Sequence, residues 1–320
     1  MVEIVSGAFT SGVRGDSGVQ EDSGVREAAE AETGAAPIER VGVVGCGTMG
    51  AGIAELCVRA GLDVRVAVSS EGSWARGEAR IRASLDRAVA KGRITEADRA
   101  AALDRVSFTT DLGELADSQL VLESVREDEQ VKLEVFASLD KVLESEDAII
   151  ATNTSSLSVA RLARATTRPD RVVGIHFFNP VPVLPLVELV GSVLTSPRTR
   201  ARAAEFAGGT LGKTVVSAPD RAGFLVNALL FPYLISAIRM VDNGLATPEV
   251  IDQGMVAGCA HPMGPLKLAD LIGLDTTVSI AQALYEETKE SLYAPPPLLL
   301  RMVECGLLGK KSGQGFYTYG

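Results

Sequence analysis

Three glycines near the start of this chain have a spacing that could serve a nucleotide. Gly45, Gly47 and Gly50 stand as GxGxxG in the segment VGVVGCGTMG, directly after an apolar run. Glycines at this spacing permit a tight turn and a close approach to a pyrophosphate, while the N-terminus of the following helix supplies oriented N–H groups. A second apolar run, DVRVAV, completes a strand–helix–strand unit. This context indicates a dinucleotide site, which we expect to include Thr48 and Met49.

One of the two histidines could act as a base. His176 ends a run of β-branched residues in DRVVGIHF, and Glu188 follows twelve positions later. A carboxylate that holds one imidazole nitrogen lets the other nitrogen accept a proton from a substrate hydroxyl. The spacing alone does not establish this pairing, and a histidine at a strand end beside a later glutamate is more often structural. The second histidine, His261 in AHPMGP, is expected to be a structural residue.

The elements that position these residues alternate between strand and helix patterns from Val41 onward, which predicts parallel strands with helical crossovers. Beyond the segment APDRAGF the patterns are helical. We therefore expect an α/β Rossmann-type N-terminal domain plus an all-α C-terminal domain. The expected boundaries are a flexible tail over 1–37, a dinucleotide-binding domain over 38–218, and a helical substrate and dimerisation domain over 219–320. The tail is predicted from its Gly, Ser, Glu and Ala content, which buries little apolar surface.

Composition excludes several classes of protein. A net charge of −10 over 320 residues argues against binding to nucleic acid or to an anionic membrane surface. The four cysteines have neither the density nor the spacing of a disulfide framework or a zinc site, so we expect reduced thiols and no metal. No apolar run reaches the ~18 residues that a membrane span requires. A cytoplasmic location is the resulting expectation.

The end of the predicted second strand lacks the acid that usually binds the adenosine ribose. Val68 stands at that position. An acid there accepts hydrogen bonds from the ribose hydroxyls and repels the 2′-phosphate of NADP. Ser69, with Arg76 or Arg65, could instead favour a phosphate, and Glu71 could replace the missing acid. NAD is the expected cofactor, and use of NADP stays open.

Six segments, taken together, carry a resemblance to a known family. They are VGCGTMGAGIAE, ATNTSSLSVARLA, GIHFFNPVPV, AGFLVN, HPMGPLKLADLIGLDT and GKKSGQGFYTY. In this order they resemble the 3-hydroxyacyl-CoA dehydrogenases, and most of all the bacterial 3-hydroxybutyryl-CoA dehydrogenases. The resemblance extends from about residue 39 to residue 320.

The resemblance implies roles for particular residues. His176 is then the general base and Glu188 its partner, while Ser155 and Asn227 hydrogen-bond the reacting oxygen of a 3-hydroxyacyl-CoA that is oxidised reversibly to the 3-oxoacyl-CoA. Further positions match cofactor contacts of the family: Ser69, Glu127, Lys132, Asn153, Asn179 and Lys311.

The basic helix ARIRASLDRAVAKGR is the expected site for coenzyme A. Ser84, Arg87 and Lys91 lie at helical spacing, with Arg80 and Arg82 nearby. Basic residues here could hold the phosphates of the acyl carrier on an otherwise acidic protein. The same pattern also fits a solvated face of an amphipathic helix.

Two departures from the family pattern leave the acyl group open. Pro185 replaces a common lysine, and the residues 126–129 read REDE in place of the usual VEN. Both changes could reshape the pocket for another acyl group, or for an acyl chain presented on an acyl carrier protein. The sequence is also compatible with a catalytically silent binding or structural paralogue, and with a dehydrogenase of small free hydroxy acids. The apolar segment LVNALLFPYLISAIRM suits burial in a core and in a homodimer interface.

Overall fold

The structure of this chain, a computed structural model, describes residues 37–320. Apart from Pro37, the predicted tail lies outside the described residues. None of the described helices has the length and apolarity that crossing a membrane would require.

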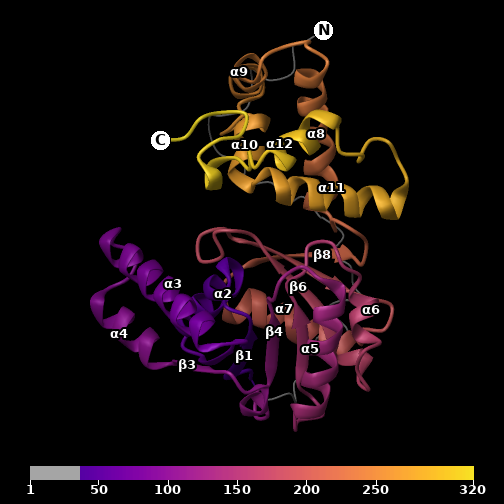
Figure 1. Cartoon of the computed structure of the whole chain (residues 1–320). Coiled ribbons are helices and arrows are strands. Elements are labelled where there is room, and N and C mark those ends of the chain that lie inside the picture. The colour runs from indigo at the N-terminus through magenta and orange to yellow at the C-terminus, as the bar shows by residue number, and fades with distance from the viewer. Residues whose placement is uncertain (1–36) are drawn as a thin grey trace, which may run out of the picture. The chain divides into compact units, whose positions relative to one another are not determined.

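The described residues form one eight-stranded sheet in the order β3-β2-β1-β4-β5-β6-β7-β8 (Figure 1). The strands are β1 (Arg40–Val44), β2 (Asp63–Ala67), β3 (Val106–Thr109), β4 (Leu120–Glu123), β5 (Ile149–Thr152), β6 (Val172–Phe177), β7 (Leu186–Gly191) and β8 (Thr214–Pro219). Strands β1, β4, β5 and β6 are almost wholly buried, as expected for a sheet covered on both faces.

One strand departs from the predicted parallel arrangement. Strand β7 pairs antiparallel with β6, while every other pairing in the described sheet is parallel. A parallel neighbour requires a long crossover, but only eight residues, 178–185, separate β6 from β7, so the chain turns back directly. The reversal places Glu188 opposite His176 in the register.

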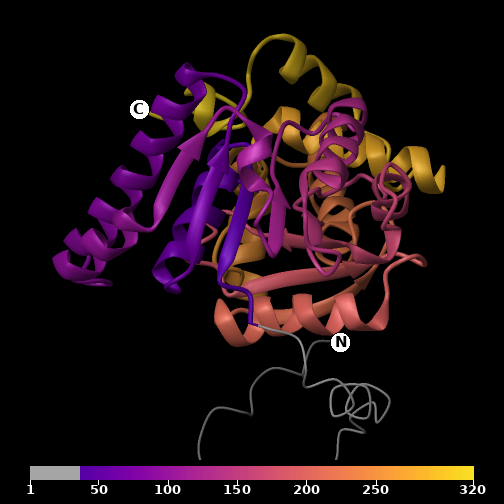
Figure 2. The ribbon, with the colours of Figure 1, turned by 90° about the horizontal axis from the view of Figure 1, so that it is seen from below.

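Helices cover both faces of the sheet. One apolar core joins it to α2 (Thr48–Arg59), α3 (Glu71–Ala90), α4 (Glu96–Asp104) and α7 (Pro197–Glu205), and a second core joins it to α5 (Glu129–Val142) and α6 (Val159–Ala163). Figure 2 shows α3 and α4 beside the edge strand β3. Four short helical turns are η1 (Leu112–Leu115), η2 (Pro169–Arg171), η3 (Phe206–Thr210) and η4 (Lys310–Ser312).

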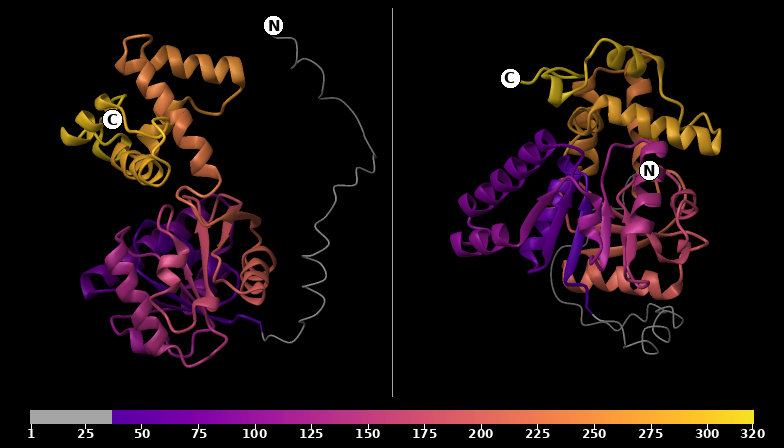
Figure 3. Two further views of the ribbon diagram at one scale, coloured as in Figure 1. Left: turned by 90° about the vertical axis from the view of Figure 1, so that its right-hand side faces the viewer. Right: turned by 60° about the horizontal axis from the view of Figure 1, so that its bottom comes forward.

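After β8 the described chain forms no further named strand, as Figure 3 shows for the orange and yellow segments. The helices are α8 (Val226–Asp242), α9 (Pro248–Cys259), α10 (Pro265–Ile272), α11 (Leu274–Thr288) and α12 (Pro297–Glu304). They bury two apolar clusters of their own. A Rossmann-type domain followed by an all-α domain is therefore confirmed, while the division between residues 218 and 219 stays a prediction.

Candidate active site

The glycine loop between β1 and α2 has the geometry of a pyrophosphate cradle. Gly45 has φ +91°, and a Cβ on it would lie 2.7 Å from the carbonyl oxygen of Ser124. Gly47 faces open space and precedes α2 without a side-chain cap, and the first turn of α2 contains no acid. The N–H groups at this helix end are thus free of side-chain acceptors and can face an anion. These residues fit a dinucleotide.

The end of β2 holds hydroxyl and guanidinium groups where an acid is usual. Val68 is 7% exposed and belongs to the core, while Ser69 is exposed. Near the start of α3, Arg76 donates a hydrogen bond to the hydroxyl of Ser73 at 3.1 Å. Arg65 instead pairs with the carboxylate of Glu114 in η1, at 3.8 Å. Of the two arginines considered, Arg76 is the one on the helix that follows this strand end.

His176 and Glu188 form a direct contact across the β6–β7 hairpin. The Nδ1 atom of His176 lies 2.7 Å from Oε2 of Glu188, and the side chains are buried. The rings of Phe178 and Phe224 flank the imidazole, with centroids 4.7 and 5.5 Å away. The predicted pair is therefore formed, and the antiparallel turn explains how residues twelve positions apart meet.

The second oxygen of Glu188 holds the start of the helical domain. Its Oε1 accepts hydrogen bonds from the backbone N–H groups of Leu225 at 3.0 Å and Val226 at 2.8 Å. Helix α8 begins there without a cap of its own side chains, so Glu188 supplies one from the sheet. Gly223 and Phe224, at φ +73° and +48°, turn the chain into this position. The φ of Phe224 is unfavourable for a residue with a side chain, which marks a backbone held by its surroundings.

The charge of Glu188 fixes the tautomer of His176. Burial alone would raise the pKa of this carboxyl, but the hydrogen bonds from His176, Val226 and Leu225 outweigh it and lower the pKa. An ionised carboxylate accepts hydrogen bonds only, so Nδ1 of the neutral imidazole must donate. The Nε2 atom is then an acceptor, which is the form that a general base requires.

Ser155 and Asn227 lie on segments next to the strands that carry His176 and Glu188. Ser155 follows β5, the parallel neighbour of β6, and Asn227 lies in the first turn of α8, next to the Val226 N–H that Glu188 accepts. Among the described residues, neither the hydroxyl of Ser155 nor the amide of Asn227 makes a hydrogen bond. Both groups therefore stay available to a bound molecule.

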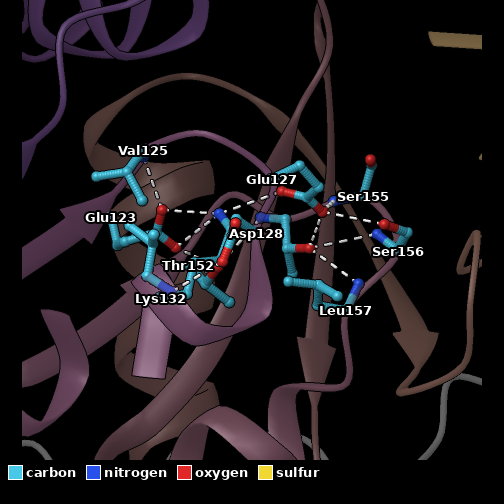
Figure 4. A network of polar contacts seen from close by, with 11 residues as sticks. Glu123, Val125, Glu127, Asp128, Lys132, Thr152, Ser155, Ser156 and Leu157 are labelled. Atoms are coloured by element: carbon cyan, nitrogen blue, oxygen red, sulfur yellow. Dashed lines mark hydrogen bonds and ion pairs between the residues drawn. The ribbon is translucent and has the colours of Figure 1, made fainter. Parts of the chain in front are cut away.

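The buried ammonium of Lys132 pairs with two acids, the buried Glu123 and the more exposed Glu127. The ammonium of Lys132, 1% exposed, lies 2.7 Å from Oε1 of Glu123 and 3.2 Å from Oε2 of Glu127 (Figure 4). Burial would raise the pKa of Glu127, but Lys132 and hydrogen bonds from Thr154 and Ser156 lower it. Sequence reasoning missed Glu123, although an acid that closes the apolar run QLVLE is a signal that could have found it.

Three other predicted cofactor residues occupy different places. Asn153 accepts a hydrogen bond from the backbone N–H of Phe177 at 2.8 Å, which joins the ends of β5 and β6. Asn179 lines a cavity beside α2 and α3. Lys311 pairs with Asp275 at 2.6 Å in the helical domain, and the structure does not bring it into contact with Glu127 or Lys132.

A cavity of about 440 Å³ lies between α2, α3 and the loop after β6. Ser84, Arg87 and Arg80 line it together with Asn179 and Thr48. This volume is within the range of small-molecule sites. Among its lining residues, the two arginines supply positive charge suited to a phosphate.

Two basic residues of the predicted CoA helix and the second histidine lie outside this cavity. Lys91 is exposed at the C-terminal cap of α3 and does not line the cavity. Arg82 pairs with Glu78 at 2.8 Å on another side of the helix. The Nδ1 atom of His261 lies 3.2 Å from the hydroxyl of Tyr233, and its structural role stays a prediction.

Family models cover nearly all of the described chain. The model described as 3-hydroxyacyl-CoA dehydrogenase, NAD binding domain, matches residues 40–221, and that of the C-terminal domain of the same enzymes matches residues 223–319. They define an NAD-dependent oxidoreductase that acts on a CH–OH group. The chain belongs to the 3-hydroxyacyl-CoA dehydrogenase family.

Relatives and solved structures agree with this family. A 3-hydroxybutyryl-CoA dehydrogenase of Mycobacterium tuberculosis is 58% identical, covering 88% of this chain and 99% of its own, and one of Bradyrhizobium diazoefficiens is 46% identical, covering 89% and 97%. The crystal structure of FadB2 of M. tuberculosis has a TM-score of 0.88 at 58% identity, covering 89% of this chain and all of its own. That of (S)-3-hydroxybutyryl-CoA dehydrogenase PaaH1 of Ralstonia eutropha has a TM-score of 0.84 at 43% identity, covering 88% and 99%.

The lowered pKa of Glu188 predicts an acid-sensitive fold. The unfolded carboxyl has the ordinary pKa of 4.5 and the folded one a lower pKa, so this group stabilises the fold above pH 4.5. That contribution is lost as the pH falls from 4.5 through the folded pKa. We expect the melting temperature of Glu188→Gln, measured by calorimetry at pH 7 and pH 4, to fall less on acidification than that of the wild type. Equal falls would show that Glu188 does not carry this stabilisation.

Proposed function

We propose that this enzyme interconverts a short-chain (S)-3-hydroxyacyl-CoA, such as 3-hydroxybutyryl-CoA, and the 3-oxoacyl-CoA, with His176 and Glu188 as the catalytic dyad. The observation that carries the proposal is the contact of 2.7 Å between Nδ1 of His176 and a carboxylate that is ionised. The substrate class follows the names of the relatives, which include a 3-hydroxybutyryl-CoA dehydrogenase at 58% identity and an (S)-specific name at 43%.

Each of the predicted site residues has a separate role in the proposed reaction. Nε2 of His176 accepts the proton of the substrate hydroxyl, and Glu188 stabilises the imidazolium that forms. Ser155 and Asn227 donate hydrogen bonds to the reacting oxygen and hold it while its charge changes. When bound, NAD⁺ accepts the hydride from the carbon that bears this hydroxyl. The glycine loop and the N-terminus of α2 would hold the pyrophosphate of the cofactor, and Glu127 and Lys132 would contact its nicotinamide half.

The cavity beside α3 is the proposed place for the CoA phosphates. Arg80 and Arg87 line it from α3, and Asn179 lines it from the loop that follows the strand of His176. An acyl carrier protein would bring its phosphopantetheine arm to the same place. Comparison of kcat/KM for acetoacetyl-CoA and for the acetoacetyl carrier-protein thioester, with NADH oxidation measured at 340 nm, distinguishes the two. We expect the CoA thioester to be preferred.

Replacement of the base tests the proposed chemistry. Proton transfer by a positioned side chain contributes about 100- to 10,000-fold, so His176→Gln should lower kcat by that factor. The affinity for NADH, measured by fluorescence, should stay nearly unchanged because the imidazole acts on the substrate. His261→Gln is the matched control, since it removes the other histidine, and should retain the wild-type kcat. Full activity of His176→Gln would exclude this dyad.

The strand end at Val68 predicts incomplete discrimination between cofactors. With no acid to repel a 2′-phosphate, we expect NADP(H) to work within about tenfold of NAD(H), a difference of ~1.4 kcal/mol. Val68→Asp should widen this ratio by weakening NADP(H) through charge repulsion. Measurement of kcat/KM with both cofactors for wild type and variant decides the matter. A hundredfold preference for NAD in the wild type, unchanged in the variant, would mean that Glu71 or another group sets the choice.

The helical domain presents apolar residues that suit a homodimer. Large apolar side chains are exposed on or beside α8, α9 and α10: Leu229, Met240, Leu245, Val250, Val256 and Leu271. Exposed apolar surface of this kind commonly marks an interface between subunits. Sedimentation equilibrium should give twice the chain mass of 33.5 kDa, and a monomer at micromolar concentration would contradict the proposal.

A further inference from the structure

Glu123 is a buried acid beside the active site to which the proposed chemistry gives no task. Its side chain is 0% exposed at the end of β4. It accepts hydrogen bonds from the ammonium of Lys132, from the backbone N–H of Val125 at 2.7 Å and from the hydroxyl of Thr152 at 2.8 Å. Its contacts therefore join the ends of β4 and β5 with helix α5, and its position is fixed from several sides.

The ammonium of Lys132 connects this fixed acid to a more exposed one. It lies 2.7 and 3.0 Å from the two oxygens of Glu123 and 3.2 Å from Oε2 of Glu127. The side chain of Glu127 is 38% exposed, so it receives less support from its surroundings than Glu123 does. A buried ammonium needs paired charge to stay ionised. Without Glu123, the cation that holds Glu127 would lose its main partner.

The other oxygen of Glu127 holds the loop that carries Ser155. Its Oε1 accepts hydrogen bonds from the backbone N–H of Ser155 at 3.2 Å and from the hydroxyl of Ser156 at 3.1 Å, and it also accepts one from the hydroxyl of Thr154 (Figure 4). The lowered pKa of Glu127 keeps this carboxylate an acceptor at neutral pH. The contacts thus run in order from Glu123 through Lys132 and Glu127 to the loop.

We propose that Glu123 is a positioning residue, which acts through Lys132 and Glu127 to hold the loop 154–156 so that Ser155 meets the reacting oxygen. This inference rests on the proposed function, because it takes Ser155 as a donor to the substrate. The Ser155 hydroxyl must be held to within a fraction of an ångström to serve, and small misplacements cost large factors in rate. Because Glu123 is wholly buried, the proposal gives it no contact with the substrate or the reacting atoms.

A double-mutant cycle tests the proposal. Glu123→Gln keeps the size of the side chain and removes its charge, and we expect kcat for acetoacetyl-CoA reduction to fall about ten- to a hundredfold. Ser155→Ala removes the group that is positioned. If Glu123 acts through Ser155, adding Glu123→Gln to Ser155→Ala should lower kcat by less than about twofold further. The dissociation constant for acetoacetyl-CoA, measured by calorimetry without cofactor, should show the same lack of additivity.

Asp140→Asn is the matched control. Asp140, on α5, is a buried acid like Glu123. It pairs with Arg168 at 3.0 Å in a region with no proposed part in the reaction. Its replacement should lower the melting temperature but leave kcat within about twofold of the wild type. A general loss of stability is thereby separated from a loss of positioning.

The outcomes separate this inference from the function on which it rests. The positioning role would be overturned if Glu123→Gln lowered kcat by the same factor in the wild-type and Ser155→Ala backgrounds. A wild-type kcat in Glu123→Gln would overturn it as well. A wild-type enzyme that does not reduce acetoacetyl-CoA would instead overturn the proposed function. If Glu123→Gln does not fold, Glu123→Asp, which keeps the charge but shortens the side chain and so withdraws it from Lys132, replaces it in the cycle with the same expected result.

Discussion

The Glu188 carboxylate is the contact on which the rest of this active site depends. One oxygen holds the imidazole of His176, and the other holds the first N–H groups of helix α8, where Asn227 lies. A single buried charge therefore orients the proposed base and fixes the start of the helical domain beside it. Because both sets of donors stabilise the ionised form, the same group that orients the base also ties domain attachment to pH.

Polar contacts of the same kind join neighbouring strand ends across the sheet. Glu123 joins β4 to β5 through Thr152, Asn153 joins β5 to β6 through the N–H of Phe177, and Glu188 continues to β7 and α8. Parallel strands end at one edge, where their last residues have no further ladder partners. Side chains at these positions satisfy the backbone and one another, which keeps the groups that would face substrate in fixed places.

Local patterns in the sequence were sufficient for the fold class and the glycine loop. Strand and helix periods, with GxGxxG between them, depend on neighbouring residues alone. The antiparallel direction of β7 was not predicted, since direction depends on how a short turn packs and not on the strand's own pattern. The His176–Glu188 pair needed the family resemblance for the same reason. Glu123 and its contact with Lys132 were missed because a buried ion pair is set by three-dimensional neighbours that composition does not record.

The eight residues between β6 and β7 connect the strands of His176 and Glu188 and also line the cavity beside α3. The two strands carry His176 and Glu188, and a shift of one residue in their pairing would turn Glu188 to the opposite face of the sheet. The loop itself lines the cavity through Asn179, Pro180, Val181 and Pro182, and Lys213 holds it through the carbonyl oxygens of Val181 and Leu184. Substitutions within this loop would therefore change the wall of the cavity proposed for the CoA phosphates while the strands keep the contact between His176 and Glu188, so a change in the proposed carrier site need not disturb the proposed base.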